Sequence, residues 1–247
     1  MSHRFFVPPE CVSGDRIIFT EDQRKQIRNV LRLRPGEIVY TLDDSGHEFM
    51  TEIQELDGEK AVGRVMEIRR PATEPKTRVT LMQAMPKGDK LDLILQKCTE
   101  IGVSEFLIIE TERTLVRMPP EKMRTRQDRW RAIVREAAEQ SGRTRLPAVQ
   151  GVLAFHEAVA RAAGSPAVIA WEEERSICFL TALHNLGDPD RVAVLIGPEG
   201  GFTSVEVDQA RESGIIPVSL GPRTLRTETA AIVSSALAIY GQEAAVA

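Results

Sequence analysis

The sequence predicts a parallel α/β domain preceded by a small β-rich domain, and three observations lead to this prediction. From residue 78 onward, short apolar runs alternate with segments of helical periodicity, as in a parallel sheet with crossover helices. Before residue 69, short alternating stretches recur between turn signals such as Asp57-Gly58, which favours a small barrel or meander. Arg69–Lys76, with two prolines and mixed charge, resembles a linker. We therefore expect domains at residues 1–72 and 73–247.

Residues 1–72 contain one helical pattern among several short strand patterns. A helix over Glu21–Leu33 is indicated by apolar residues on adjacent turns, and Pro35-Gly36 ends it. The expected strands are Arg4–Val7, Arg16–Phe19, Ile38–Tyr40, Glu48–Ile53 and Ala61–Val65.

Residues 73–247 contain the longer and more regular elements. The expected strands are Val79–Met82, Phe106–Ile109, Ala167–Ala170, Val192–Ile196 and Ile215–Leu220. The expected helices are Lys87–Ile101, Lys122–Gln140, a helix that starts at the capping box Thr203–Glu206 and ends before Gly214, and Thr227–Tyr240. Pro217 cannot donate a ladder hydrogen bond, so its strand should be an edge or irregular strand.

The composition is that of an ordinary soluble globular protein, with 42% hydrophobic and 28% charged residues in a chain of 247. No segment approaches the roughly 18 consecutive apolar residues of a membrane span, and the polar start Met1–Arg4 lacks a signal-peptide apolar region. Cysteines and histidines show no metal-ligand spacing. We therefore expect a cytoplasmic protein without a metal ion or a membrane partner.

Positive charge is concentrated in two segments, although the net charge is −4. Six basic and two acidic residues lie between Arg16 and Arg34, and ten basic and four acidic residues lie between Arg113 and Arg145. Nine of those ten basic residues are arginines, whose planar guanidinium groups grip phosphate and stack on unpaired bases. One such cluster alone would fit a solvated helix face with ion pairs. Two clusters favour a polyanionic partner.

Two segments near the C-terminus, Ile196–Phe202 and Leu220–Ala230, carry most of the functional information. Each follows a predicted strand and precedes a helix, so the two turns should lie side by side at the strand ends, where a small ligand would bind. Neither contains a phosphate-binding Gly-x-x-x-x-Gly-Lys-Ser/Thr or a dinucleotide-binding Gly-x-Gly-x-x-Gly pattern. Taken alone, the first segment could be a tight structural turn. The polar and charged residues of the second favour a binding site.

Together with Glu100–Val103 and Arg135–Arg143, these segments resemble hallmark blocks of the bacterial 16S ribosomal RNA uracil-N3 methyltransferases, the RsmE-type branch of the SPOUT superfamily. The N-terminal part is similar to the PUA-like RNA-binding domain of that family through Arg4–Val7 and Val30–Arg32. The resemblance covers nearly the whole chain. At Gln26 the family often has histidine, so we assign this position no catalytic role.

The resemblance implies a fold that periodicity does not reveal. It is a SPOUT-type parallel sheet with a C-terminal trefoil knot, preceded by a small PUA-like β-barrel domain. Knots are nearly absent from other proteins, so only the family likeness supports this expectation. The resemblance further implies a homodimer, with S-adenosylmethionine bound at the subunit interface among three loops. These are the loop after Ala170, the Gly197–Gly201 turn and Leu220–Ala230. The cofactor-binding residues expected by motif position are Ala170, Gly197, Pro198, Glu199, Gly200, Gly201, Leu220, Gly221, Leu225, Arg226, Thr227 and Ala230.

The implied reaction sets the expected catalytic roles. Uracil N3 has a free lone pair only after it loses its proton, so the site needs a base and cationic or N–H groups that stabilise the anion. We expect Arg226 to be the stabilising cation and Glu199 to be a base or an orienting carboxylate. The alternative is that both residues only stiffen the loops as an ion pair.

The implied partner is 16S rRNA in the small ribosomal subunit, and the basic clusters would follow its phosphates. The expected RNA-binding residues are Arg4, Arg24, Arg28, Arg32, Arg129, Arg135 and Arg143. Two alternatives stay open. The protein could be another SPOUT methyltransferase that modifies a ribose 2′-oxygen or a different base, or a non-catalytic RNA-binding or ribosome-assembly factor. The intact glycine-rich segment and Leu225–Ala230 argue against the second alternative.

Overall fold

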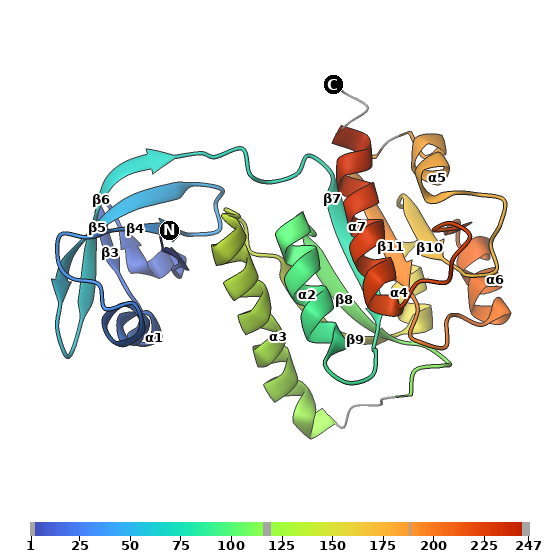
Figure 1. Ribbon diagram of the computed structural model, residues 1–247, viewed down its shortest axis with the longest axis horizontal. Helices are drawn as coiled ribbons and strands as arrows, with labels where there is room; N and C mark the ends of the chain where they lie inside the picture. Colours follow the sequence, from blue (N-terminus) through green and yellow to red (C-terminus); the bar gives the residue numbers. More distant parts are fainter. Residues whose placement is uncertain (1–2, 116–119, 188, 244–247) are drawn as a thin grey trace. The chain divides into compact units, whose positions relative to one another are not determined.

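The computed structural model describes residues 3–115, 120–187 and 189–243 (Figure 1). The chain divides into two compact units, one formed by residues 1–74 and 138–146 and the other by residues 75–137 and 147–247. Among the described residues, no helix has the length and apolarity that crossing a membrane requires.

The first unit is a six-stranded mixed sheet with the strand order β1-β4-β5-β6-β3-β2. Strand β1 pairs with β4 in parallel, and the other pairs are antiparallel. Its apolar core includes Phe5, Ile17 and Ile53, each at most 1% exposed. Its elements are β1 (Arg4–Phe6), η1 (Pro9–Cys11), β2 (Val12–Ser13), β3 (Arg16–Ile18), α1 (Glu21–Lys25), η2 (Gln26–Val30), β4 (Ile38–Leu42), β5 (Glu48–Leu56) and β6 (Ala61–Arg69).

The helix of the first unit begins where the sequence predicts but is less regular. A capping box starts it, in which Thr20 Oγ1 accepts a hydrogen bond from the Gln23 backbone N–H at 3.3 Å. After Lys25 the backbone continues as a π-helical turn, and Arg32 takes a left-handed conformation with φ of 57°. The expected continuous helix over Glu21–Leu33 is therefore two short segments, because local periodicity does not distinguish α from π hydrogen bonding.

The second unit is built on six parallel strands in the order β12-β10-β11-β7-β8-β9. The predicted parallel sheet is confirmed, and β12, which contains Pro217, is an edge strand as expected. The elements of this part of the chain are β7 (Arg78–Ala84), α2 (Lys90–Ile101), β8 (Glu105–Glu110), α3 (Pro120–Ser141), β9 (Ala148–Ala154), α4 (Phe155–Ala162), β10 (Ala167–Ala170), α5 (Phe179–Asn185), β11 (Arg191–Ile196), α6 (Ser204–Glu212), β12 (Ile216–Val218) and α7 (Thr227–Glu243). The sequence analysis missed β9, α4 and α5.

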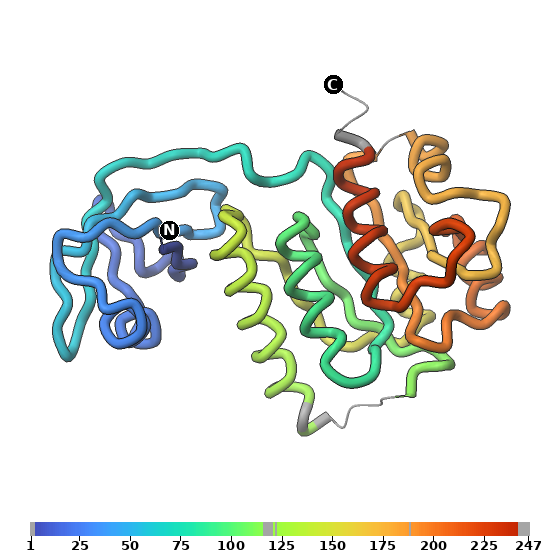
Figure 2. The backbone as a smooth tube through the Cα atoms, viewed as in Figure 1, coloured from blue at the N-terminus to red at the C-terminus, as the bar shows by residue number. Residues whose placement is uncertain are grey.

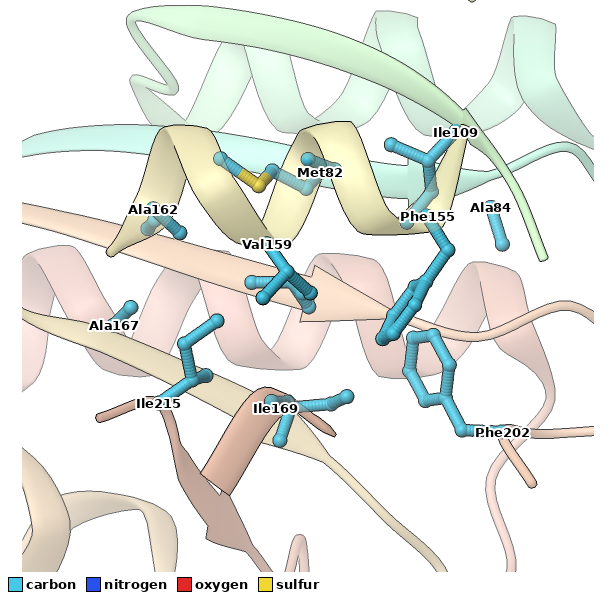
Figure 3. Packing of buried hydrophobic residues seen from close by; sticks show 14 of the residues in the cluster. Met82, Ala84, Ile109, Phe155, Val159, Ala162, Ala167, Ile169, Phe202 and Ile215 are labelled. Carbon is cyan, nitrogen blue, oxygen red and sulfur yellow. The ribbon is translucent and has the colours of Figure 1, made fainter. Parts of the chain in front are cut away.

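Helices cover both faces of the parallel sheet. On one face, α7 packs against α2, α5, β7 and β11 (Figure 1). On the other, Val159 of α4 packs in one buried cluster with Met82 of β7 (Figure 3), and the same cluster includes Val207 of α6 and Leu195 of β11. Successive strand residues point to opposite faces, so Gln83, which bonds to Thr227 of α7, points away from Met82.

The C-terminal chain returns from the edge of the sheet to its centre. After β12 it runs through residues 219–226 and then forms α7, which packs on the central strands (Figure 2). The carboxyl ends of β10, β11 and β12 therefore carry three neighbouring loops. The trefoil knot implied by the resemblance stays a prediction.

Candidate active site

A cavity of about 380 Å³ lies at the carboxyl ends of β10, β11 and β12. Open parallel sheets typically bind ligands at this end of their strands. Three loops and the first turn of α2 form its walls. The lining residues are Lys90, Ala170, Trp171, Glu172, Arg175, Ile196, Gly197, Pro198, Glu199, Gly201, Ser219, Leu220, Gly221, Arg223, Thr224, Leu225, Arg226, Thr227 and Ala230.

The loop after β11 is fixed from both sides. Phe202 is 1% exposed, and its ring centroid lies 5.6 Å from that of Phe155 in the core beneath the loop (Figure 3). Gly201 has φ of +68°, and an added Cβ atom there would overlap the carboxylate of Glu172. From the segment after β8, Arg113 Nη1 donates to the carbonyl oxygen of Gly200 at 2.7 Å. Main-chain groups of this loop are thus held at the cavity wall.

Thr227 joins the second loop to the first. Its Oγ1 donates to the Gly197 carbonyl oxygen at 2.6 Å and accepts from Gln83 Nε2 at 3.0 Å. The side chain is buried. One hydroxyl group therefore connects the start of α7 with the ends of β11 and β7.

Glu199 faces a lysine, not the arginine that the ion-pair alternative invokes. Its Oε1 lies 2.8 Å from Lys90 Nζ and accepts from the Lys87 backbone N–H at 3.1 Å. Burial alone would raise the pKa of Glu199, but the hydrogen bond from Lys90, the backbone N–H donors and the charge of Lys90 together hold this pKa below its usual range. The lowered pKa makes the carboxylate a weak base, and its Oε1 is already engaged by Lys90, so the site suits an orienting role better than that of a base.

Arg226 lines the cavity and is exposed. Within the part of the chain that the structure describes, no ion pair or side-chain hydrogen bond engages its guanidinium group. The group is thus available to an anion in the cavity.

All the residues expected to bind a cofactor line this one cavity, except Gly200. A Cβ atom added at Gly200 would lie 3.2 Å from the Cβ of Arg113, so this residue faces the Arg113 side chain. Its neighbours Glu199 and Gly201 line the cavity. The loop after Ala170 is expected at the cofactor, and its residues Trp171, Glu172 and Arg175 line the cavity, although sequence reasoning did not single them out. Sequence reasoning missed Lys90 as a lining residue. Lys90 lies far from the three loops in sequence, so no local pattern signals it.

The arginines expected to bind RNA fall into two groups. Arg28, Arg32 and Arg135 are exposed. The others have partners within their own unit: Arg4 with Glu48 at 3.0 Å, Arg24 with the carbonyl oxygens of Asp57 and Gly58, Arg129 with Asp92, and Arg143 with Glu74 at 2.7 Å. Arg143 is only 4% exposed, which gives it a structural role and leaves little of it for RNA. Arg117 of the second basic cluster, and the side chain of Lys122, lie outside the described residues.

Comparisons with known proteins agree with this architecture. A family model described as an RNA methyltransferase domain matches residues 73–239, and one described as an RNA methyltransferase PUA domain matches residues 19–66. The ribosomal RNA small subunit methyltransferase E of Bacillus subtilis (strain 168) is 32% identical over 229 residues, which cover 91% of this chain and 90% of that protein. The chain belongs to the ribosomal RNA small subunit methyltransferase E family.

As a member of the methyltransferase E family, the chain combines a PUA-like N-terminal sheet with a parallel α/β RNA methyltransferase domain. The methyltransferase E of Synechocystis sp. is 34% identical and spans 96% of this chain and 77% of that protein. A crystal structure of methyltransferase E from Neisseria gonorrhoeae, bound to S-adenosyl methionine, has a TM-score of 0.85 at 30% identity and covers 96% of each chain. A methyltransferase structure from Legionella pneumophila in complex with the same cofactor has a TM-score of 0.83 at 28% identity, over 99% and 98% of the two chains.

Proposed function

We propose that this protein uses S-adenosylmethionine to methylate N3 of a specific uridine in the 16S rRNA of the small ribosomal subunit. The observation that carries the proposal is the cavity formed by the loops after β10, β11 and β12. The relatives from N. gonorrhoeae and L. pneumophila share the fold over nearly the full chain and contain the cofactor. The names of the relatives support ribosomal RNA of the small subunit as the substrate.

The cavity has the size and the chemistry that this cofactor requires. Its volume of about 380 Å³ falls within the usual range for small-molecule sites. At Gly197 and Gly221 the main chain, without side chains, would contact the flat adenine ring. The carboxylate of Glu172 would bind the ribose hydroxyl groups of the cofactor, or its positively charged ammonium and sulfonium groups. Trp171 Nε1 is a buried donor with no partner among the described residues, as a ligand-facing group would be.

When bound, S-adenosylmethionine supplies a methyl group that passes in line to uracil N3, and the electron pair of the broken S–C bond stays on sulfur. The chain must hold the base in near-attack geometry and stabilise the anion that remains when the N3 proton passes to solvent water. We assign Arg226 to the stabilisation of the uracil anion, because its guanidinium is exposed at the cavity and unpaired within the described residues. We assign Glu199 an orienting role, because its pKa is lowered and Lys90 already engages its Oε1.

We propose that exposed arginines of both basic clusters hold the RNA, with Arg28, Arg32 and Arg135 as the main contacts. Arg4, Arg24 and Arg129 would contribute only by giving up present partners. We also propose, on the family resemblance, that the protein is a cytoplasmic homodimer with a knotted C-terminal domain over residues 73–247 and an RNA-binding domain over residues 1–72.

The test is transfer of labelled methyl groups from S-adenosylmethionine to small ribosomal subunits and to naked 16S rRNA, with nucleoside analysis of the product. We expect N3-methyluridine. A 2′-O-methylated nucleoside or another methylated base would support the other SPOUT activity. No transfer to either substrate, with RNA binding intact, would support the non-catalytic factor.

A further inference from the structure

Lys90 stands at an unusual position for a cation. It is the first residue of α2, directly after the N-cap Asp89. The N-terminus of a helix carries a partial positive charge, so a lysine in the first turn weakens the helix unless something else compensates. The compensation comes from two other segments of the chain.

Two carboxylates, one from each cofactor loop, face the Lys90 ammonium group. Glu199 Oε1 of the loop after β11 lies 2.8 Å from Nζ, and Glu228 Oε2 of the first turn of α7 lies 3.6 Å from it. The Glu228 side chain is only 14% exposed, and its Oε2 atom is buried without a hydrogen-bond partner among the described residues. The contact with Lys90 is therefore the interaction that offsets the cost of burying the Glu228 carboxylate.

The other charged groups around the cavity do not replace Lys90. Glu172 and Arg175 belong to the loop after β10, and Arg223 and Arg226 to the loop before α7; none of them forms an ion pair with Glu199 or Glu228 among the described residues. On α2 itself, Asp92 pairs with Arg129. Lys87 precedes the helix and reaches Glu199 through its backbone N–H.

We propose that Lys90 is a positioning residue of the cofactor site, whose ammonium group fixes the spacing of the Glu199 loop and the start of α7. The cavity wall is made of main-chain groups from these two segments, so their spacing sets the fit of the ligand. The inference rests on the proposed function for the identity of that ligand, S-adenosylmethionine.

Removal of the ammonium group should produce a pH-dependent defect. In K90M, which keeps the length of the side chain without its charge, Glu199 and Glu228 would repel each other across a shared gap. Like charge raises the pKa of one carboxyl, and protonation at lower pH would remove the repulsion. In the wild-type protein the hydrogen bond to Glu199 raises the pKa of Lys90, whereas the pKa of Glu199 is lowered. Both groups therefore stay charged between about pH 5.5 and 8.

The first measurement is calorimetric titration with S-adenosylmethionine at about pH 8 and about pH 5.5. We expect K90M to bind roughly tenfold more weakly at the higher pH, recovering most of this loss at the lower pH, since one pKa unit corresponds to a tenfold change. K90R should stay near wild type at both values. Adding E228Q to K90M should remove the pH dependence. K97M is the matched control, because Lys97 forms a half-buried pair with Glu100 on the same helix and does not line the cavity.

The second measurement needs no cofactor. The pKa of the Glu199 carboxyl, followed by NMR in the free protein, should rise in K90M and stay low in K90R. An unchanged pKa would overturn the inference, as would wild-type affinity of K90M at both pH values, or an equal loss in K90M and K90R. K90Q replaces K90M if that variant does not fold. If the wild-type protein itself does not bind S-adenosylmethionine, the proposed function fails, while the NMR titration still decides the role of Lys90.

Discussion

Gly201 and Gly214 share a left-handed backbone but differ in their surroundings. Their φ angles are +68° and +83°; an added Cβ atom overlaps the Glu172 carboxylate at Gly201 and meets nothing within 4 Å at Gly214. Alanine at either position should lower the free energy of unfolding by about 1–2 kcal/mol, because L residues are strained there.

We expect only Gly201→Ala also to weaken S-adenosylmethionine binding, since it displaces Glu172 at the cavity. Urea unfolding and calorimetry measure the two effects. Equal cofactor affinity in both variants would mean that the loop after β11 does not form the binding wall.

Arg226 and Arg223 test whether one specific cation serves the reaction. Both line the cavity and both are exposed. If Arg226 stabilises the developing uracil anion, Arg226→Ala should lower the single-turnover methyl-transfer rate about 10²–10³-fold, as for other preorganised donors at a developing anion. Arg223→Ala should lower it far less. Similar losses in the two variants would point to a general positive field in place of a specific contact.

Among single site residues, those inside a recognisable sequence motif could be predicted, whereas those outside any motif could not. The glycine-rich segment and Leu220–Ala230 carry their own signal, and their side chains and main chain line the cavity. Lys90 reaches the site because α2 begins at the same edge of the sheet, which no local pattern expresses. The sequence predicts a base or an orienting carboxylate at Glu199, with an ion pair to Arg226 as the alternative; tertiary packing pairs it with Lys90, which neither expectation named.

Among the elements, the start of α7 depends on one buried hydroxyl group. Thr227→Val keeps the shape of the side chain but removes the donor to the Gly197 carbonyl and one of the two acceptors of Gln83 Nε2, which keeps its bond to the Ala84 carbonyl oxygen. An unsatisfied buried polar group costs about 1–3 kcal/mol. We expect this loss in urea unfolding of Thr227→Val, with weaker cofactor binding, and near wild-type values for Thr227→Ser. An equal loss in both variants would indicate that the methyl group matters as much as the hydroxyl, and wild-type stability of Thr227→Val would refute the role of the hydroxyl.

The segment after β8 holds the glycine loop through Arg113. Its guanidinium Nη1 donates to the carbonyl oxygens of Gly200 at 2.7 Å and Phe202 at 3.4 Å. Arg113→Ala should therefore speed hydrogen exchange of the amides around residues 198–203, because local opening loses these bonds. Arg131→Ala is the control, since Arg131 pairs with Asp128 on the exposed face of α3. Unchanged exchange in Arg113→Ala would refute this role and return Arg113 to the RNA-binding cluster.

The elements that the sequence predicted are the long or strongly periodic ones. Helix α2 and strands β7, β8, β10 and β11 have apolar patterns that local reasoning detects. Strand β9 contains Gly151 and helix α5 has seven residues, so each offers a weak pattern. Helix α4 is amphipathic, but its eight residues give the pattern little length. Strand order, which brings β10 between β11 and β12, depends on long-range pairing and cannot be obtained from local periodicity.

For the whole molecule, the net charge of −4 conceals two basic segments in an otherwise acidic chain. The structure divides the arginines of these segments by their partners. Those tied to carboxylates or carbonyl oxygens, such as Arg143, stabilise the fold, and those exposed, such as Arg28, Arg32 and Arg135, can meet phosphate. RNA affinity should thus depend on a subset of the basic residues.

Charge reversal at that subset should weaken RNA binding and change its salt dependence together. Each lost phosphate contact should reduce the slope of log affinity against log salt by about 0.7–0.9, because fewer counterions are released. We expect a lower affinity and a shallower slope for Arg28→Glu, Arg32→Glu and Arg135→Glu, measured with 16S rRNA fragments between about 50 and 200 mM salt. Arg211→Glu makes the same change in net charge on α6, where Arg211 pairs with Asp208. If Arg211→Glu lowers the affinity and the slope as much as the three other variants do, RNA binding responds to the total charge of the protein and the basic segments have no particular role. An effect confined to Arg28→Glu, Arg32→Glu and Arg135→Glu assigns the RNA path to these three arginines.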